Sequence, residues 1–190
     1  TLSLHDALPI LMEEDMFWYV VETKLDLNAK MLDFLNRQEN IDAFIPQVEK
    51  WFKCTEFEEF QLRDMYPGYI FIKTILNEEN FKDKYAGLFQ TVERLGKVIE
   101  KDEFIALCDD EIGILSKLLD NSASIRHSCG KYNGNDLEIF SGPLKGLEKN
   151  IKKINRHKRI AEVRFGILGK EMLLPLEVIN KKGSVLEDAR

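Results

Sequence analysis

The sequence has few cysteines and no long apolar run. Its three cysteines, Cys54, Cys108 and Cys129, form neither a Cys-x-x-Cys pair nor a metal-ligand spacing with histidine. We therefore predict reduced thiols, no disulfide and no metal site, as is typical of a cytoplasmic protein. Because no apolar run approaches the length of a membrane span and no signal sequence is recognisable, we expect a cytoplasmic protein that does not bind membranes.

Motifs of nucleotide-binding and hydrolytic enzymes are also lacking. The sequence has no phosphate-binding loop, no Gly-x-Gly-x-x-Gly, no Gly-x-Ser-x-Gly and no His-Glu-x-x-His. The acidic pair Asp109-Asp110 falls on the expected solvent face of a helix, and the pattern indicates no pocket beside it. We therefore predict no catalytic residues, no cofactor and no enzymatic activity.

The first residues stand apart from the rest of the chain. Thr1 to Ile10 read Thr-Leu-Ser-Leu-His-Asp-Ala-Leu-Pro-Ile, which resembles the translation of a sequencing-library adapter. We treat residues 1–11 as an assembly artefact and expect them to add nothing to the fold. The natural chain is then expected to start at Met12 or Met16.

Charge divides the remaining chain into two parts. Residues 12–120 hold 13 Lys and Arg against 24 Asp and Glu, a net charge of −11. Residues 131–182 hold 12 against 6, a net charge of +6. Such asymmetry predicts two modules with different partners, the basic one suited to nucleic acid and the acidic one to protein.

The first module, residues 12–120, alternates short apolar runs with helical periodicity. The runs and their turn residues predict strands and helices in the order β-α-β-β-α-β-α, the split βαβ of ferredoxin-like folds with an added helix. The expected strands are 17–21, 42–53 with Pro46 as an interruption, 57–63, 69–72 and 92–99. The expected helices are 25–38, 77–89 with Asn77 as a cap, and 101–120 with Ile105, Cys108, Ile112, Leu115 and Leu119 on one face.

The second module, residues 134–182, follows a stretch in which turn formers dominate. We expect residues 121–133 to be a linker and residues 183–190 a frayed tail. Between them, five short strand candidates with Gly and Pro turns favour a small β-barrel. These candidates are 137–140, 151–154, 160–165, 171–174 and 177–179.

A basic stretch begins the second module. Seven of the twenty residues from Phe140 to Arg159 are Lys or Arg, and isolated apolar and turn residues interrupt them. The functional interpretation is a phosphate-contacting surface, and the alternative is a solvated charged face. Composition alone slightly favours the alternative, because runs of charge are usually just surface.

Two motifs resemble those of the NusG family of transcription factors. Tyr66-Pro67-Gly68-Tyr69-Ile70-Phe71, with Trp18–Val21 and Phe44–Pro46, is similar to the family's NGN domain. Ser141–Gly146 and the later Lys152–Arg159 segment are similar to its KOW domain, most of all to the LoaP antiterminators within the family. The resemblance implies an α+β protein, a ferredoxin-like NGN domain followed by a small SH3-like β-barrel KOW domain. Lys149 departs from the motif, which usually has glycine there, a residue that tolerates unusual backbone angles.

The resemblance also implies partners and contact residues. The NGN domain would bind the clamp helices of bacterial RNA polymerase through Tyr66, Pro67, Gly68 and Tyr69, with Tyr69 equally compatible with the core, and Phe44 and Trp18 favoured as core residues. The KOW domain of a monomeric antiterminator would bind a structured RNA hairpin. Its implied RNA contacts are Lys145, Lys152, Lys153, Arg156, His157, Lys158 and Arg159. The alternative is a general NusG-type factor whose KOW domain is a protein adaptor for Rho or the ribosome.

Overall fold

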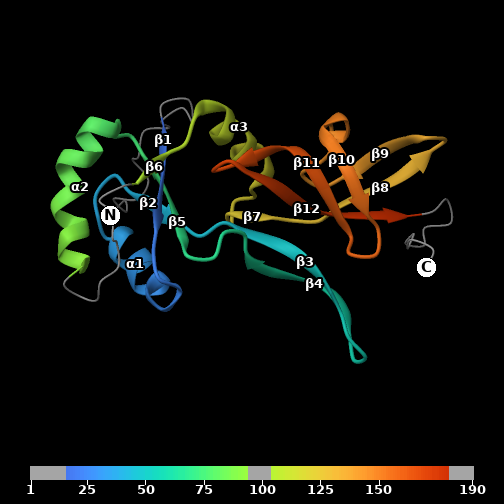
Figure 1. Ribbon diagram of the computed structural model, residues 1–190, viewed down its shortest axis with the longest axis horizontal. Coiled ribbons are helices and arrows are strands. Elements are labelled where there is room, and N and C mark those ends of the chain that lie inside the picture. The colour runs from blue at the N-terminus through green and yellow to red at the C-terminus, as the bar shows by residue number, and fades with distance from the viewer. Residues whose placement is uncertain (1–15, 94–103, 180–190) are drawn as a thin grey trace, which may run out of the picture. The chain divides into compact units, whose positions relative to one another are not determined.

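A computed structural model describes residues 16–93 and 104–179 (Figure 1). The chain divides into two compact units that are discontinuous in sequence. The first unit combines residues 1–44 with 68–107, and the second combines 45–67 with 108–190. This division differs from the boundary that we predicted near residue 120, because residues 45–67 leave the first module and join the second unit.

The first unit is built on a four-stranded sheet of order β2-β5-β1-β6. Its strands are β1 (Phe17–Glu22), β2 (Asp42–Phe44), β5 (Tyr69–Thr74) and β6 (Ile105–Ala106). All of its pairings are antiparallel, and the buried, largely apolar and aromatic runs in β1 and β5 lie at its centre. The strands predicted at 17–21 and 69–72 are therefore confirmed.

Two helices lie on the same side of this sheet (Figure 1). They are α1 (Asn28–Leu35), preceded by the 3-10 turn Leu25–Leu27, and α2 (Glu78–Glu93). Tyr19 stacks on Phe81 of α2 with ring centroids 4.4 Å apart, and both rings are buried. The cap predicted for α2 is present, since Asn80 donates its backbone N–H to Asn77 Oδ1 at 3.0 Å.

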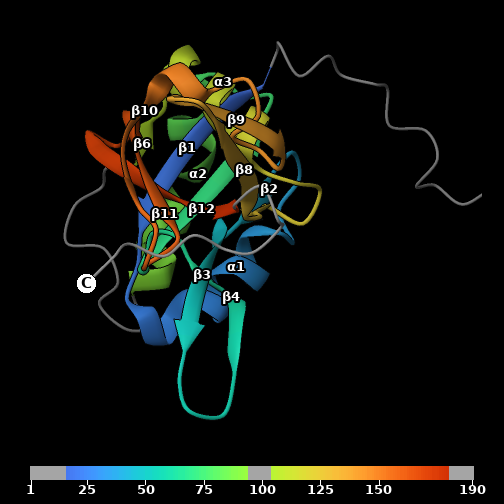
Figure 2. The same ribbon diagram turned by 90° about the vertical axis from the view of Figure 1, so that its right-hand side faces the viewer.

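Within the described residues, the second unit contains two sheets and one α-helix. The three-stranded sheet has the order β4-β3-β7, and β3 and β4 form a long antiparallel hairpin (Figure 2). Its strands are β3 (Gln47–Lys53), β4 (Glu58–Asp64) and β7 (Ser124–Ile125), and the helix is α3 (Asp109–Leu118). Pro46 separates β2 from β3, so the predicted strand 42–53 is two strands in different sheets.

The five-stranded sheet has the order β10-β11-β12-β8-β9. Its strands are β8 (Ser128–Asn133), β9 (Asp136–Ser141), β10 (Ile151–Asn155), β11 (Ile160–Ile167) and β12 (Lys170–Ile179). Alternate residues of β11 and β12, among them Val163 and Leu174, form its buried core. This all-strand region after an α+β region confirms the predicted fold class.

Several predicted elements differ from those observed. The stretch 121–133, predicted as a linker, contains β7 and β8. Ser128 and Gly130 are buried on one face of β8, but as turn formers they did not indicate a strand. The predicted strands 171–174 and 177–179 are the single strand β12, which accommodates Pro175. The predicted helix 101–120 is shorter, beginning at Asp109 after the strand β6, so Ile105 is an exposed strand residue.

Other predictions fall partly or wholly outside the described residues. Of the strand predicted at 92–99, residues 92 and 93 belong to α2 and the rest lie outside the described part of the chain. Residues 1–11 and the tail 183–190 lie outside it as well. No helix in the described part is long and apolar enough to cross a membrane.

The departure at Lys149 has a simple structural explanation. Lys149 lies in the 3-10 turn Glu148–Asn150, and its φ is not in the positive region. Any residue adopts this backbone conformation, so glycine is not needed. Glycine is required instead at Gly142, in the preceding turn, because its φ is +90° and an added Cβ would lie 2.5 Å from Ser128 Cα.

Candidate functional site

One face of the first unit's sheet gathers aromatic side chains. The antiparallel register pairs Trp18 with Lys73, and Phe71 with both Val20 and Phe44, so these residues share the face opposite Tyr19. Trp18 and Phe44 meet edge to face at 5.5 Å, and Phe44 lies 5.9 Å from Phe71. We call Trp18, Phe44, Tyr69 and Phe71 the aromatic face.

A cation lies across the aromatic face. Lys73 Nζ is 4.5 Å from the ring centroid of Trp18 and 5.0 Å from that of Phe44. Trp18 and Phe71 are buried, as predicted for Trp18, whereas Phe44, Tyr69 and Lys73 are half-buried. The face therefore offers partly accessible aromatic rings and a positive charge, a combination suited to a protein interface.

The Pro67-Gly68 turn leads into this face. Gly68 has φ +86°, which glycine readily adopts in a Pro-Gly turn, and its carbonyl oxygen accepts the backbone N–H of Thr23 at 2.6 Å. Pro67 is exposed, and Tyr69 is the first residue of β5. The two compact units meet in sequence here, so Tyr66 and Pro67 belong to the second unit and Gly68 and Tyr69 to the first.

Tyr66 packs within the second unit. Burial, together with the negative charge of Glu111, raises the pKa of the Tyr66 phenol to about 12. Glu111 lies in the first turn of α3, where its Oε2 accepts the backbone N–H of Cys108 at 3.1 Å. The hydroxyl of Tyr66 therefore sits in a poorly solvated place near the start of α3.

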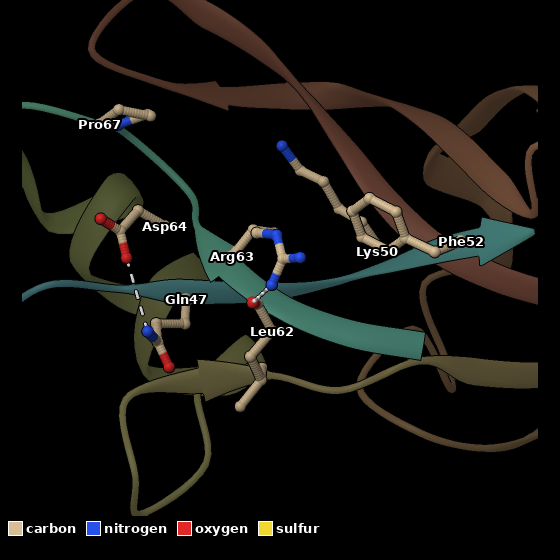
Figure 3. A pocket seen from close by; sticks show the side chains of 7 residues that line it. All are labelled: Gln47, Lys50, Phe52, Leu62, Arg63, Asp64 and Pro67. Carbon is tan, nitrogen blue, oxygen red and sulfur yellow. Dashed lines mark hydrogen bonds between the residues drawn. The ribbon is translucent and has the colours of Figure 1, made fainter. Parts of the chain in front are cut away.

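The β3–β4 hairpin carries a shallow hollow of about 500 Å³ (Figure 3). The Arg63 guanidinium carbon lies 4.7 Å from the Phe52 ring centroid, and Gln47 donates a long hydrogen bond to Asp64 at 3.5 Å. Two cations, Lys50 and Arg63, and one carboxylate, Asp64, stand around this hollow. Its lining residues are Gln47, Lys50, Phe52, Leu62, Arg63, Asp64 and Pro67.

The residues between β10 and β11 form a basic turn, by which we mean Arg156, His157 and Lys158. Asn155 Oδ1 accepts the backbone N–H of Lys158 at 2.8 Å and fixes the turn. His157 and Lys158 are exposed, whereas Arg156 is half-buried with its guanidinium carbon 5.2 Å from the Tyr132 ring centroid. Three residues predicted to bind RNA are thus brought to one tight turn.

Arg159, the next residue, behaves differently from the basic turn. It is only 8% exposed and has a left-handed backbone with φ +51°. Its guanidinium is ion-paired with Glu177 and lies 3.3 Å from the ring centroid of Trp51 in β3. Arg159 therefore holds the turn onto the β3–β4 hairpin instead of facing solvent with the rest of the predicted RNA-binding set.

The other predicted RNA contacts are exposed but not equivalent. Lys152 is bound to Glu171 at 2.8 Å and to Glu162 at 3.2 Å, and the hydrogen bond that it donates to Glu171 is the largest cause of its raised pKa. Lys153 is exposed on the same strand. Lys145 is exposed in the separate turn that starts at Gly142, to whose carbonyl it donates its backbone N–H at 3.2 Å.

Two features of this region were not predicted from the sequence. They are the contact of Tyr132 with Arg156 and the pairing of His127 with Glu49. Tyr132 fell in the predicted linker, where Gly130, Asn133 and Gly134 obscured the strand. His127 was given no role, yet its ring stacks on Phe60 at 4.2 Å, and its Nδ1 lies 2.6 Å from Glu49 Oε2. No local signal marked this strand, because its buried residues Ser128 and Gly130 are turn formers.

We compared the chain with known protein families. A family described as "Transcription termination factor nusG" matches residues 16–115. This range covers β1 to β6, α1, α2 and most of α3. Members of this family are transcription factors that bind RNA polymerase. The chain belongs to the NusG family, and it is therefore a transcription factor and not an enzyme. No curated protein gave a significant match to the chain.

Proposed function

We propose that this NusG-family protein is an antiterminator of the LoaP type, which docks on RNA polymerase and contacts a structured RNA hairpin through its C-terminal region. The observation that supports RNA contact is the basic turn, which brings Arg156, His157 and Lys158 into one loop that Asn155 fixes. Lys153 and Lys145 extend the positive surface on either side in sequence. Its action would lie in the cytoplasm, with the transcribing polymerase.

The chemistry of the turn suits a nucleic-acid backbone combined with an unpaired base. Lys158 can neutralise a phosphate, and the planar guanidinium of Arg156 can bind two phosphate oxygens. The imidazole of His157 and the ring of Tyr132 offer stacking surfaces to bases splayed from a hairpin loop. Arg159 supports this surface from below without contacting RNA, because its guanidinium is already bound to Glu177.

Polymerase docking is assigned to the aromatic face and the turn before it. Tyr69 and Phe44 are half-buried and lie on one sheet face, so a partner helix could complete their burial. An aromatic anchor of this kind contributes about 2 kcal/mol or more to a protein interface. We expect Tyr69 to contribute more binding free energy than Tyr66, because the Tyr66 hydroxyl is desolvated within its own unit.

The protein-adaptor alternative also has support. Phe140 is 42% exposed and Leu173 is 54% exposed, and both are large apolar residues of the five-stranded sheet. An adaptor for Rho or the ribosome would need such apolar contacts, whereas an RNA reader needs the basic turn. Leu173→Ser and Arg156→Ala/Lys158→Ala therefore separate the two functions.

The deciding experiment is a gel-shift titration over a range of salt concentrations. The probe is a hairpin RNA from the leader transcript of the operon beside the gene, and the variant is Arg156→Ala/Lys158→Ala. A matched control, Lys30→Ala/Arg37→Ala, removes the same charge from the α1 region. We expect the variant to bind more weakly and its salt slope to fall by roughly two, because two phosphate contacts are lost.

The same proteins should be tested for polymerase binding in a pull-down. We expect Arg156→Ala/Lys158→Ala to retain polymerase and Tyr69→Ala to lose it. RNA affinity that is unchanged in the basic-turn variant, with loss of Rho or ribosome binding in Leu173→Ser, would replace the RNA-reader proposal with the adaptor alternative.

A further inference from the structure

Three potential metal ligands meet at the edge of β8. Among the residues that the structure describes, one ligand atom each of His127, Cys129 and Glu177 lies within 4.8 Å of the other two. All three side chains are half-buried. We propose that His127, Cys129 and Glu177 form a zinc-binding site whose fourth ligand is water. This proposal is independent of RNA binding.

The fold, and not the sequence spacing, assembles the site. Cys129 in β8 and Glu177 in β12 are direct register partners in a parallel strand pair. His127 precedes β8 by one residue and contributes its ring from the turn between β7 and β8. The ligands are therefore 2 and 48 positions apart in sequence, which explains why a search for paired cysteines and histidines finds no metal motif.

His127 is already oriented as metal-binding histidines are. Its Nδ1 lies 2.6 Å from Glu49 Oε2, which also accepts the backbone N–H of His127 at 2.7 Å. The tautomer that donates from Nδ1 to this carboxylate keeps its lone pair on Nε2, the nitrogen then available to a metal. A carboxylate in this place fixes the ring and raises the basicity of the ligand. Stacking on Phe60 holds the ring from its face.

Glu177 is also held in place by a neighbouring side chain. Arg159 binds its Oε1, which leaves Oε2 directed to Cys129, whose thiol donates to it at 3.9 Å. A metal ion would take the place of that thiol proton, which would pass to solvent. Burial raises the pKa of the Cys129 thiol, and metal binding would release the thiol proton.

Charge and ligand type favour Zn²⁺. The Cys129 thiolate and the Glu177 carboxylate together balance a divalent ion, and the nearby charges of Arg159 and Glu49 balance each other. One sulfur, one imidazole nitrogen and one carboxylate oxygen form a mixed set that suits zinc better than the hard ions Mg²⁺ and Ca²⁺. Tetrahedral bonds of 2.0–2.3 Å require ligand atoms about 3.3–3.8 Å apart, so small rotations of the three side chains complete the site.

Such a site would join three strands. Zinc would link β8 to β12 directly and, through His127 and Glu49, to β3 of the hairpin. Its binding free energy would add to the stability of the second unit, because the unfolded chain does not hold these ligands together. We therefore expect zinc to raise the melting temperature of the whole chain.

The test uses Co²⁺ as a spectroscopic probe for Zn²⁺ in the full-length protein. Cys54 and Cys108 are exposed, so the background variant is Cys54→Ser/Cys108→Ser, in which Cys129 is the remaining thiol. We expect one Co²⁺ per chain, with the near-ultraviolet absorption of a cobalt–thiolate bond that added Zn²⁺ abolishes. Glu49→Gln should weaken binding by 10- to 100-fold while leaving the ligands in place.

Further substitutions in this background decide the assignment. Cys129→Ser should remove the thiolate absorption, and Glu177→Gln should weaken binding, whereas the control His157→Ala should change neither. Circular dichroism of each variant checks that it is folded, and Glu49→Gln tests the site without altering any ligand. The proposal fails if the background protein binds no Co²⁺, if Cys129→Ser retains the absorption, or if Glu49→Gln binds as tightly as the background.

Discussion

The two units each place a cation on aromatic rings, but with different consequences. In the first unit, Lys73 lies 4.5 Å from the Trp18 ring on a half-buried sheet face. In the second unit, Arg159 lies 3.3 Å from the Trp51 ring, is buried and is ion-paired with Glu177. Burial with a carboxylate partner makes the second cation part of the fold. A cation at an accessible aromatic face remains available to a partner protein.

The same contrast occurs between the basic turn and Arg159, the residue that follows it. His157 and Lys158 are exposed and Arg156 is half-buried, whereas Arg159, which has a left-handed backbone, is buried. A run of positive charge in a sequence therefore does not form one functional surface. Backbone conformation decides which of its members can meet RNA and which support the turn.

The largest expected effect is the difference in unfolding free energy lost when Arg159 or Lys73 is replaced. Arg159→Ala leaves Glu177 without its partner in a poorly solvated place, and breaking a buried ion pair costs about 3–5 kcal/mol of unfolding free energy. Lys73→Ala removes an accessible cation–π contact and should cost about 0.5–1 kcal/mol. Urea denaturation of both variants measures the difference, and equal losses would show that the contrast between the two units is wrong.

The next effect compares one glycine from each unit. In Gly142→Ala the new Cβ would lie 2.5 Å from Ser128 Cα at φ +90°, whereas in Gly68→Ala the nearest atom is Thr23 O at 3.1 Å at φ +86°. We expect a loss of about 2–3 kcal/mol at Gly142 and about 1 kcal/mol at Gly68. Thermal unfolding ranks the two, and the reverse order would contradict the close approach of residues 142 and 128.

A smaller effect concerns acid sensitivity of the second unit. Burial disfavours the charged form of Glu49, but hydrogen bonds from His127 and Arg126 outweigh it and hold the pKa of this carboxyl below its usual value. A lowered folded-state pKa stabilises the protein above the unfolded-state pKa of about 4.3, and this stabilisation is lost as the pH falls through the folded-state pKa.

The variant Glu49→Gln removes that titration. We expect it to be about 1–2 kcal/mol less stable than the unmodified chain at pH 7, and the difference to be smaller at about pH 3, below the unfolded-state pKa. Urea unfolding at the two pH values measures the difference. A gap that persists undiminished at pH 3 would mean that packing, and not the ionised carboxylate, accounts for the role of Glu49.

The sequence predicted the first unit's central strands and α2 well, for identifiable reasons. β1 and β5 are continuous runs of apolar, aromatic and β-branched residues, and α2 has an Asn77 cap, so local signals agree with the tertiary structure. β8 could not be predicted, because its one-sided burial depends on pairing with β12, 48 positions away in sequence. Local patterns do not record such pairing.

The candidate sites show the same limit. The Pro67-Gly68 turn and the basic turn could be located from residue types alone, since proline, glycine and asparagine favour turns for local reasons. The burial of Arg159 depends on Trp51 and Glu177, and the His127, Cys129 and Glu177 cluster depends on three separate segments. These arrangements follow from tertiary packing, which no periodicity in the sequence indicates.

The most direct test of the proposed function is transcription in vitro across a terminator placed downstream of the leader RNA hairpin. We predict that the unmodified protein increases readthrough in the presence of the hairpin. Arg156→Ala/Lys158→Ala should still bind polymerase but give only background readthrough, while Lys30→Ala/Arg37→Ala should act like the unmodified protein. Full readthrough by the basic-turn variant, or readthrough that is independent of the hairpin, would contradict the account.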